Sequence, residues 1–345
     1  MARTKIARKD NQAARPAIPG RIAAAAAAAA AAAMIAGTGT ALAAPAHQAH
    51  QASPARPAAA GAQLNCAASP HTCGYPDATS TGVPATAHLL TVPGQVSSGP
   101  GWKYDSRGWV EVSGNGATLS NLYIPYNLDI SASNVTVSNV KVVAAGTGTS
   151  GISLRHTKNV TIENSTIYGP SNTGPNRLQY GIKDIYADSS GTVLAANNIW
   201  NTATGIAISE GTVRDNYIHD FGYYAGDHDN GIASKAGDPA GLTITHNTVL
   251  NPLGQTDAIQ LSQDFGPQLN CTITGNLLAG GGYTVYGGAS GPATPANIVI
   301  TNNRFSRIYY PKSGQYGPDA YVSTTGPGDL WSGNTWDDTG ATLNP

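Results

Sequence analysis

Charged and aromatic residues are scarce in this chain. Charged side chains make up 11% of its 345 residues, aromatic side chains 7%, and there are only three cysteines. In a secreted protein, two cysteines as close as Cys66 and Cys73 most simply form a disulfide. Cys271 then has no partner and falls in an apolar column that we expect to face inward, where a free thiol is inert. The cysteine content therefore argues against cysteine catalysis.

Long apolar runs and long helical patterns are also missing. The main apolar run, residues 23–35, is short and mostly alanine, which disfavours the alternative of a transmembrane anchor. Six basic residues precede it, and Ala41-Leu42-Ala43 supplies a small-x-small cleavage site after it. We therefore predict a secretory signal peptide over 1–43, a disordered linker rich in alanine and proline over 44–63, and a secreted protein.

The balance of charge disfavours nucleic acid as a partner. Removing residues 1–43 takes away six of the 19 basic residues and one of the 20 acidic residues, which leaves a net charge near −6. Proteins that bind nucleic acid present an excess of positive charge to the phosphates. We expect a monomer that has no nucleic-acid partner and no membrane contact once the signal peptide is removed.

An asparagine-containing phrase recurs through the second half of the chain. An aliphatic residue is followed by two small or polar residues, an asparagine, one further residue and an apolar residue. The repeated asparagines are Asn197, Asn216, Asn247, Asn276 and Asn303, which are 19, 31, 29 and 27 residues apart. A degenerate copy of the phrase follows at Asn334. Repeats of this length with period-2 alternation indicate a solenoid of β-strands. Because asparagine tolerates a left-handed backbone and both donates and accepts hydrogen bonds, we predict an asparagine ladder at one corner.

Two apolar columns run beside the ladder. One column is filled by Val135, Val160, Leu242, Cys271 and Ile298. The other is filled by Ile152, Ile182, Ile206, Ile232, Ile259 and Val285. In the earlier coils the asparagine comes one slot sooner, at Asn121, Asn139 and Asn164, and we expect these coils to bend differently. The coils span 108–345, and residues 64–107 form an N-terminal cap segment with a short disulfide loop.

Several stretches carry a family resemblance. They are Cys73-Gly-Tyr-Pro-Asp-Ala-Thr-Ser-Thr-Gly-Val-Pro84, the Asn-Val-Thr-Val and Asn-Val-Thr-Ile openings, and residues 276–287, 303–306 and 334–340. On these residues the chain resembles the secreted right-handed parallel β-helix proteins of actinomycetes, relatives in fold of pectate lyases and polygalacturonases. The resemblance implies an all-β fold, a single-stranded right-handed parallel β-helix of about nine coils, and it leaves the reaction open.

Aspartates concentrate between residues 215 and 264, where seven of them occur. The sequence His228-Asp229-Asn230 precedes the core isoleucine of one coil, and Asp257 takes the slot of Asn230 on the next. We expect Asn230 and Asp257 to be neighbours one rung apart. Similar family members often carry His-x-Asp-Gly-Ile-Gln here, whereas this chain has Asn230 and Ala233 in place of the aspartate and the glutamine. Asp229 and Asp257 are therefore the better candidate carboxylates.

These residues suit a polysaccharide hydrolase. Glycoside hydrolysis needs one protonated and one ionised carboxyl, and close carboxylates split their proton affinities. Asp229, Asp257 and Asp264 would supply these groups, with His228 assisting.

A polysaccharide lyase is the other enzymatic reading. It needs a base for the proton next to a uronate carboxyl and a cation to stabilise the developing charge. Lys235 is the candidate base, and Asp227, Asp229 and Asp257 are candidate ligands for Ca²⁺.

Aromatic residues beside the aspartates suit a glycan groove near residues 204–290, because sugar rings stack on tyrosine faces. The candidate substrate-binding residues are Tyr223, Tyr224, Gln260, Tyr283, Tyr286 and Arg155. A non-catalytic carbohydrate-binding or cell-surface protein is the alternative, favoured by Asn230 and by the lack of a long insertion that would build a deep cleft.

Overall fold

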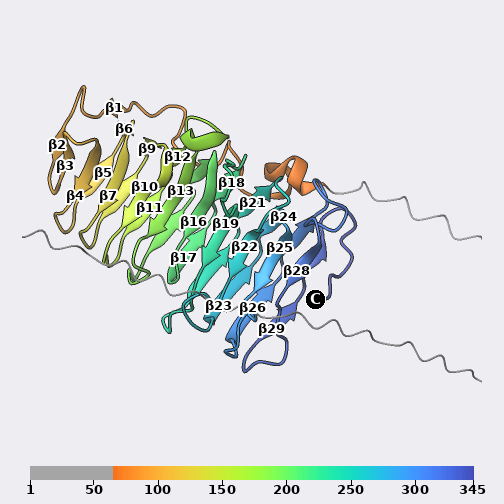
Figure 1. The fold of residues 1–345 in the computed structure, drawn as a ribbon. Coiled ribbons are helices and arrows are strands. Elements are labelled where there is room, and N and C mark those ends of the chain that lie inside the picture. Colours follow the sequence, from red (N-terminus) through yellow and green to blue (C-terminus); the bar gives the residue numbers. More distant parts are fainter. Residues whose placement is uncertain (1–64) are drawn as a thin grey trace, which may run out of the picture. The chain divides into compact units, whose positions relative to one another are not determined.

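Three parallel sheets surround one apolar core in residues 65–345, the part of the chain that the computed structural model describes (Figure 1). The predicted signal peptide and linker lie outside these residues. Within the described range, no helix is both long and apolar enough to cross a membrane. The same range contains three short 3-10 helices, η1 (Cys66–Ala68), η2 (Pro70–Cys73) and η3 (Gly174–Asn176).

The strands of each sheet follow one another up the stack of coils. Sheet A consists of β1 (Leu90–Thr91), β6 (Leu122–Ile124), β9 (Lys141–Val143), β12 (Thr166–Tyr168), β15 (Asn198–Trp200), β18 (Tyr217–His219), β21 (Thr248–Asn251), β24 (Leu277–Gly280), β27 (Arg304–Ser306) and β30 (Thr335–Trp336). Sheet B consists of β2 (Ser98–Gly99), β3 (Trp102–Asp105), β4 (Trp109–Val112), β7 (Asn127–Ile130), β10 (Gly146–Leu154), β13 (Leu178–Asp184), β16 (Thr202–Ala207), β19 (Asn230–Ser234), β22 (Asp257–Leu261), β25 (Tyr283–Gly287) and β28 (Gly317–Ala320). Sheet C consists of β5 (Thr118–Ser120), β8 (Thr136–Ser138), β11 (Thr161–Glu163), β14 (Val193–Ala195), β17 (Gly211–Arg214), β20 (Leu242–Thr245), β23 (Leu269–Thr274), β26 (Ala296–Thr301) and β29 (Leu330–Ser332).

Each coil passes through sheet C, then sheet A, then sheet B. Eight such coils are complete, from β5 to β28, and a ninth ends after β29 and β30. Apart from the antiparallel pairs β2–β3 and β3–β4, the strands pair in parallel with the coils before and after them. The predicted all-β parallel helix of about nine coils is confirmed.

The two predicted apolar columns lie in the core. The isoleucine column is in continuous register from β10 to β25, and each of its side chains is fully buried. In the other column Leu242 pairs with Cys271 and Cys271 with Ile298. Burial raises the pKa of the Cys271 thiol to about 12, so this free cysteine is the inert core residue that the pattern predicts.

The asparagine ladder is continuous from Asn197 to Asn334. The side-chain amide of Asn247 donates to Asn276 Oδ1 at 3.0 Å and to the carbonyl of Val213 at 2.9 Å. Asn303 donates in the same way to Asn334 Oδ1 at 3.0 Å, so the degenerate last copy is a full member. At the corner between sheets C and A, backbone groups cannot pair with a neighbouring strand. The stacked asparagine amides supply hydrogen bonds to these groups.

Because asparagine tolerates a left-handed backbone, the ladder asparagine is the expected left-handed residue of the corner. The structure places a different residue in that conformation. In the later coils it is the residue before, such as Asp215 with φ 58° and His246 with φ 53°. In the early coils Asn139 and Asn164 occupy this same slot, with φ 53° and 47°. The early coils therefore bend as the later ones do, and the expectation of a different bend is wrong. They differ in the ladder slot, which in the Asn139 coil holds Val140.

Replacing Asn247 with alanine is expected to lower the free energy of unfolding by about 1–3 kcal/mol, because two buried backbone groups of the preceding coil, the carbonyl of Val213 and the amide of Asn216, lose their side-chain partner. Asn115 is an exposed asparagine that accepts one hydrogen bond, from Ser133 N. Asn115→Ala is the matched control and should cost well under 1 kcal/mol. Chemical denaturation of both variants measures the difference, and equal losses would contradict the structural role of the ladder.

The N-terminal segment, residues 65–91, lies along sheet A. Cys66 and Cys73 form the predicted disulfide. The loop that they close packs against Leu250, Leu277 and Ala279 of the late coils β21 and β24, rather than at the first coil. From there the segment runs back along the sheet until β1 pairs with β6. The chain reverses at β2–β3–β4 before the regular coils begin.

Candidate functional site

A groove lies across the outer face of sheet B. Residues that follow the core isoleucines face outward, because side chains alternate along a strand. In successive coils these residues are Lys183, Ala207, Ala233 and Gln260, in continuous register. The two alanines leave space between longer neighbours, and a cavity of about 730 Å³ forms there.

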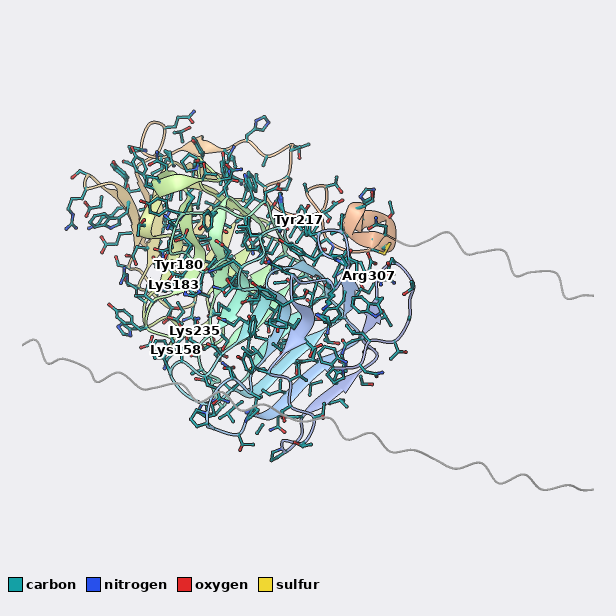
Figure 2. All side chains as sticks on the ribbon, turned by 45° about the vertical axis from the view of Figure 1, so that its right-hand side comes forward. Lys158, Tyr180, Lys183, Tyr217, Lys235 and Arg307 are labelled. Carbon is teal, nitrogen blue, oxygen red and sulfur yellow. A yellow bond between two sulfur atoms is a disulfide. The ribbon has the colours of Figure 1, made fainter. Side chains whose placement is uncertain are left out.

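Lysines and aromatic rings line this cavity, among them Tyr180, Lys183, Tyr186, Lys235 and Phe265. Figure 2 shows Tyr180, Lys183 and Lys235 on the same side of the stack of coils. The ammonium of Lys183 lies 4.0 Å from the centre of the Tyr180 ring. The cavity therefore combines cationic groups with apolar surface.

A smaller cavity of about 160 Å³ continues the first toward the start of the strands. It shares Tyr180, Ala207, Ala233 and Lys235 with the larger cavity and adds, among others, Thr204, His228 and Asn230. We call the two cavities together the sheet B groove. It begins one coil earlier than the sequence suggested, because Gln179 and Tyr180 of β13 form part of its wall.

Four of the predicted site residues meet in or beside the groove. The Lys235 ammonium lies 2.9 Å from Gln260 Oε1 and 3.0 Å from Asp264 Oδ2. His228 is exposed at the other end of the groove. Its backbone carbonyl accepts hydrogen bonds from Thr204 Oγ1 and from Asn230 Nδ2, each at 3.2 Å. These bonds hold the loop that carries His228 against β16 and β19.

Asp229 and Asp257 do not line the groove, contrary to the prediction that they are its catalytic pair. The register places Asn230 opposite Asp257, as expected for neighbours one rung apart. Yet Asp229 and Asp257 have no exposed surface, and none of their four carboxyl oxygens has a hydrogen-bond partner within residues 65–345. A substrate in the groove cannot touch either carboxyl in this structure.

The surroundings of these two carboxyls favour their protonated forms. Burial raises the pKa of Asp229 to about 7, the charge of Asp227 adds to this, and Arg177 opposes it. Burial also raises the pKa of Asp257 well above its ordinary value, against the nearby positive charge of Lys235. Desolvation disfavours a charged carboxylate, and no hydrogen bond offsets it here. Burial therefore favours the uncharged form of Asp257 at neutral pH, whereas Asp229, with a pKa of about 7, is close to half protonated there.

A buried ion pair, Arg177 with Asp227, closes the loop that precedes β19. Arg177 is fully buried, and its Nε lies 2.6 Å from Asp227 Oδ2 while its Nη2 contacts Oδ1. Its Nη1 donates to Thr147 Oγ1 at 3.2 Å, and the Tyr224 ring centre lies 5.3 Å from the guanidinium carbon. Nothing in the local sequence marks Arg177, since it follows a glycine-proline turn without periodicity. Asp227 in turn lies beside His228 of the groove.

The comparisons with known proteins agree with this architecture. Residues 110–262 match the family model described as the right handed beta helix region. The chain is a right-handed parallel β-helix protein. The comparisons with curated proteins and with solved structures found no match. The fold fits a pectate-lyase-like or glycosidase-like protein as well as a cell-surface β-helix protein, and a shared fold does not fix the reaction.

Two of the predicted tyrosines lie on sheet B of this β-helix, beyond the residues that line the groove. Tyr286 follows Gln260 in the outward column, and its ring centre lies 5.7 Å from that of Tyr283. Tyr316 and Tyr321 stand next to them, with ring centres at 5.8 Å from Tyr283 and Tyr286, and both are more than half exposed. Sequence reasoning missed this second pair because it lies outside the regular repeats.

The remaining predicted binding residues lie beside the groove. Tyr223 and Tyr224 are exposed on the loop before β19. Arg155 is paired with Asp129 at 2.8 Å, and its Nη1 lies 3.5 Å from the hydroxyl of Tyr186, which lines the groove. The arginine therefore contacts Tyr186 of the groove wall and does not line the groove itself.

The predicted calcium ligands are not arranged as a metal site in the described part of this β-helix. Within residues 65–345 no group of three or more His, Cys, Asp or Glu side chains is placed to hold a metal ion. Both carboxylate oxygens of Asp227 accept hydrogen bonds from Arg177. The raised pKa values of Asp229 and Asp257 favour uncharged carboxyls, which are poor ligands for Ca²⁺.

Proposed function

We propose that this β-helix protein is secreted and binds an acidic polysaccharide in the sheet B groove, which it cleaves by β-elimination. The observation that carries the proposal is the groove itself, where Lys183 and Lys235 stand among Tyr180, Tyr186 and Phe265. Lysines attract uronate carboxylates, and aromatic faces stack on sugar rings. The Cys66–Cys73 disulfide supports secretion, since such bonds persist in oxidising compartments.

Hydrolysis fits the groove less well, because it needs two carboxyl groups that reach the scissile bond. In the described part of the chain, Asp184 and Asp264 are the carboxylates that line the groove. Asp184 accepts hydrogen bonds from the backbone of Ser189 and Tyr186, and Asp264 is paired with Lys235. Both carboxylates are thus already held by other groups of the protein, and Asp229 is out of reach.

Elimination needs a base for the proton on the carbon that bears the uronate carboxyl, and positive charge at that carboxyl. The electrons of the broken C–H bond form a carbon–carbon double bond, and the glycosidic oxygen leaves and takes up a proton. The Lys235 ammonium is paired with Asp264 and donates to Gln260, so we assign Lys235, with Lys183, to the uronate carboxylate rather than to the base. His228 is the base, since histidine exchanges protons near neutral pH.

Incubation of the purified protein with a panel of neutral and uronic polysaccharides tests the proposal. Ultraviolet absorbance of an unsaturated uronate, together with new reducing ends, is the expected result. New reducing ends without that absorbance would show hydrolysis instead. Binding without cleavage of any polymer would leave a carbohydrate-binding β-helix.

Replacing Lys235 or Lys183 with methionine is expected to weaken binding of the acidic polysaccharide about fivefold each, because each loses one charge contact of about 1 kcal/mol. The wild-type affinity should fall with added salt, and the variants should depend on salt less. Lys103→Met, in the antiparallel strand β3 that precedes the regular coils, is the matched control and should leave affinity unchanged.

Calorimetric titration measures these affinities. In the same series, His228→Gln should keep the affinity and lose turnover. Equal binding by Lys235→Met and the wild type would show that the glycan does not occupy the groove.

A further inference from the structure

His246 connects the N-terminal segment to the stack of coils. It lies at the corner between β20 and β21, directly before the ladder residue Asn247, and its side chain is about half exposed. Asp215 occupies the same left-handed slot one coil earlier. His246 is therefore the rung neighbour of Asp215 and faces the segment that passes over this corner.

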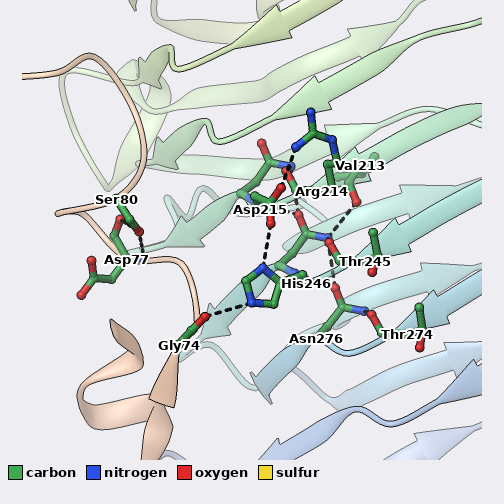
Figure 3. A network of polar contacts seen from close by, with 12 residues as sticks. Gly74, Asp77, Ser80, Val213, Arg214, Asp215, Thr245, His246, Thr274 and Asn276 are labelled. Atoms are coloured by element: carbon green, nitrogen blue, oxygen red, sulfur yellow. Dashed lines mark hydrogen bonds and ion pairs between the residues drawn. The ribbon is translucent and has the colours of Figure 1, made fainter. Parts of the chain in front are cut away.

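Both ring nitrogens of His246 lie against acceptors (Figure 3). Nδ1 is 2.7 Å from Asp215 Oδ1, and Nε2 is 2.9 Å from the backbone carbonyl oxygen of Gly74. A carboxylate and a carbonyl can only accept hydrogen bonds, whereas a neutral imidazole carries one N–H. Both contacts are hydrogen bonds only when His246 is the doubly protonated imidazolium.

We propose that His246 is a pH-dependent latch that fastens the N-terminal segment to the β-helix when protonated and releases Gly74 when it loses a proton. The single proton of the neutral ring stays on Nδ1, because the bond to the Asp215 carboxylate is charge-assisted and stronger than a bond to a carbonyl. The carbonyl of Gly74 then loses its donor. This inference does not depend on the proposed function.

Charged groups from both the coils and the N-terminal segment surround His246. Arg214 Nη1 binds the other oxygen of Asp215 at 2.7 Å and opposes a second positive charge nearby. On the segment, His71 lies 2.6 Å from Asp77, and the Tyr75 ring stacks on His246 at 5.6 Å. Together with His246 and Asp215, His71 and Tyr75 line a cavity of about 270 Å³. Burial raises the pKa of the Tyr75 hydroxyl; the charge of Arg304 lowers this pKa and that of Asp337 raises it.

Release is local, because the segment has anchors on both sides of Gly74. Ala67 N donates to Asp337 Oδ2 at 3.1 Å on one side. On the other side Gly82 N donates to the carbonyl of Ala196 at 2.8 Å, and Val83 N to Thr166 Oγ1 at 3.0 Å. The stretch from Gly74 to about residue 81 therefore loosens, while the disulfide loop before it stays attached.

Amide hydrogen exchange of Gly74 and Tyr75 measures the latch, since these amides donate to the carbonyls of His71 and Pro70. After correction for intrinsic exchange, their protection in the full-length protein should fall about three- to tenfold between about pH 5 and about pH 8. His246→Asn, which tolerates the left-handed backbone and does not titrate, should show low protection at both values. His88→Asn, an exposed histidine of the same segment, and His71→Asn should keep the wild-type pH dependence.

Ring-nitrogen NMR of the unmodified protein gives a second test that needs no variant. At about pH 5 both nitrogens of His246 should carry a proton, and at about pH 8 Nδ1 alone. The proposal fails if His246→Asn retains the wild-type pH dependence of exchange. It also fails if the low-pH ring of His246 lacks a proton on either nitrogen.

Discussion

Arg177→Met is expected to lower the free energy of unfolding by about 3–5 kcal/mol, because it removes one partner of a buried ion pair and leaves the other charge buried. Arg177 is fully buried and Asp227 nearly so, and two guanidinium nitrogens bind both carboxylate oxygens. Without the guanidinium, Asp227 must stay charged without a partner or take up a proton. Chemical denaturation of the wild type and the variant measures the loss.

Two further variants separate the buried pair from a general loss of arginine. Arg155→Met breaks a partly exposed pair with Asp129 and should cost at most about 1 kcal/mol. The double variant Arg177→Met, Asp227→Asn removes both charges and should recover a large part of the loss. If Arg177→Met costs no more than Arg155→Met, the loop before β19 does not depend on this pair.

The fold could be predicted from the sequence, but the burial of the carboxyls could not, because it depends in part on the Arg177–Asp227 pair. Coil period, register and the ladder repeat locally, so the positions of Ile232, Asn247 and Asp257 follow from counting residues between phrases. The burial of Asp229 does not follow from counting. It requires Arg177, two coils earlier, to close the loop, and Asn251, whose amide donates to the carbonyls of Asp229 and Asp257 at 2.8 and 2.9 Å.

The prediction of the candidate site fails in a similar way at the residues that come from irregular segments. Neighbours on adjacent rungs, such as Asn230 and Asp257, were predictable because register alone places them. Tyr316 and Tyr321 lie directly before and after β28 in bends with no periodic signal, and Gly74 reaches His246 from 172 residues away. Contacts of this kind depend on how loops cross the regular faces, which the repeat does not encode.

Stability should fall as the pH rises from about 4 to about 7, because Asp229 keeps a proton in the folded state that the unfolded chain has lost. The pKa of Asp229 is raised to about 7, whereas an aspartate in an unfolded chain titrates near about 3.9. Between these values the folded state binds more protons than the unfolded state, so the free energy of unfolding decreases with pH. A difference of about three units corresponds to roughly 4 kcal/mol, and the raised pKa of Asp257 acts in the same direction.

Asp229→Asn should remove this loss, because an uncharged amide replaces a carboxyl that the fold holds uncharged. At about pH 4 the variant should match the wild type within about 1 kcal/mol, and at about pH 8 it should exceed it by up to roughly 4 kcal/mol. Denaturation at both values measures the difference. Asp238→Asn, in a partly exposed turn where the carboxylate accepts one hydrogen bond from Ala240 N, should instead follow the wild-type pH dependence. Parallel curves for Asp229→Asn and the wild type would show that Asp229 is ionised in the folded protein, and the case for Asp229 as a catalytic carboxylate would reopen.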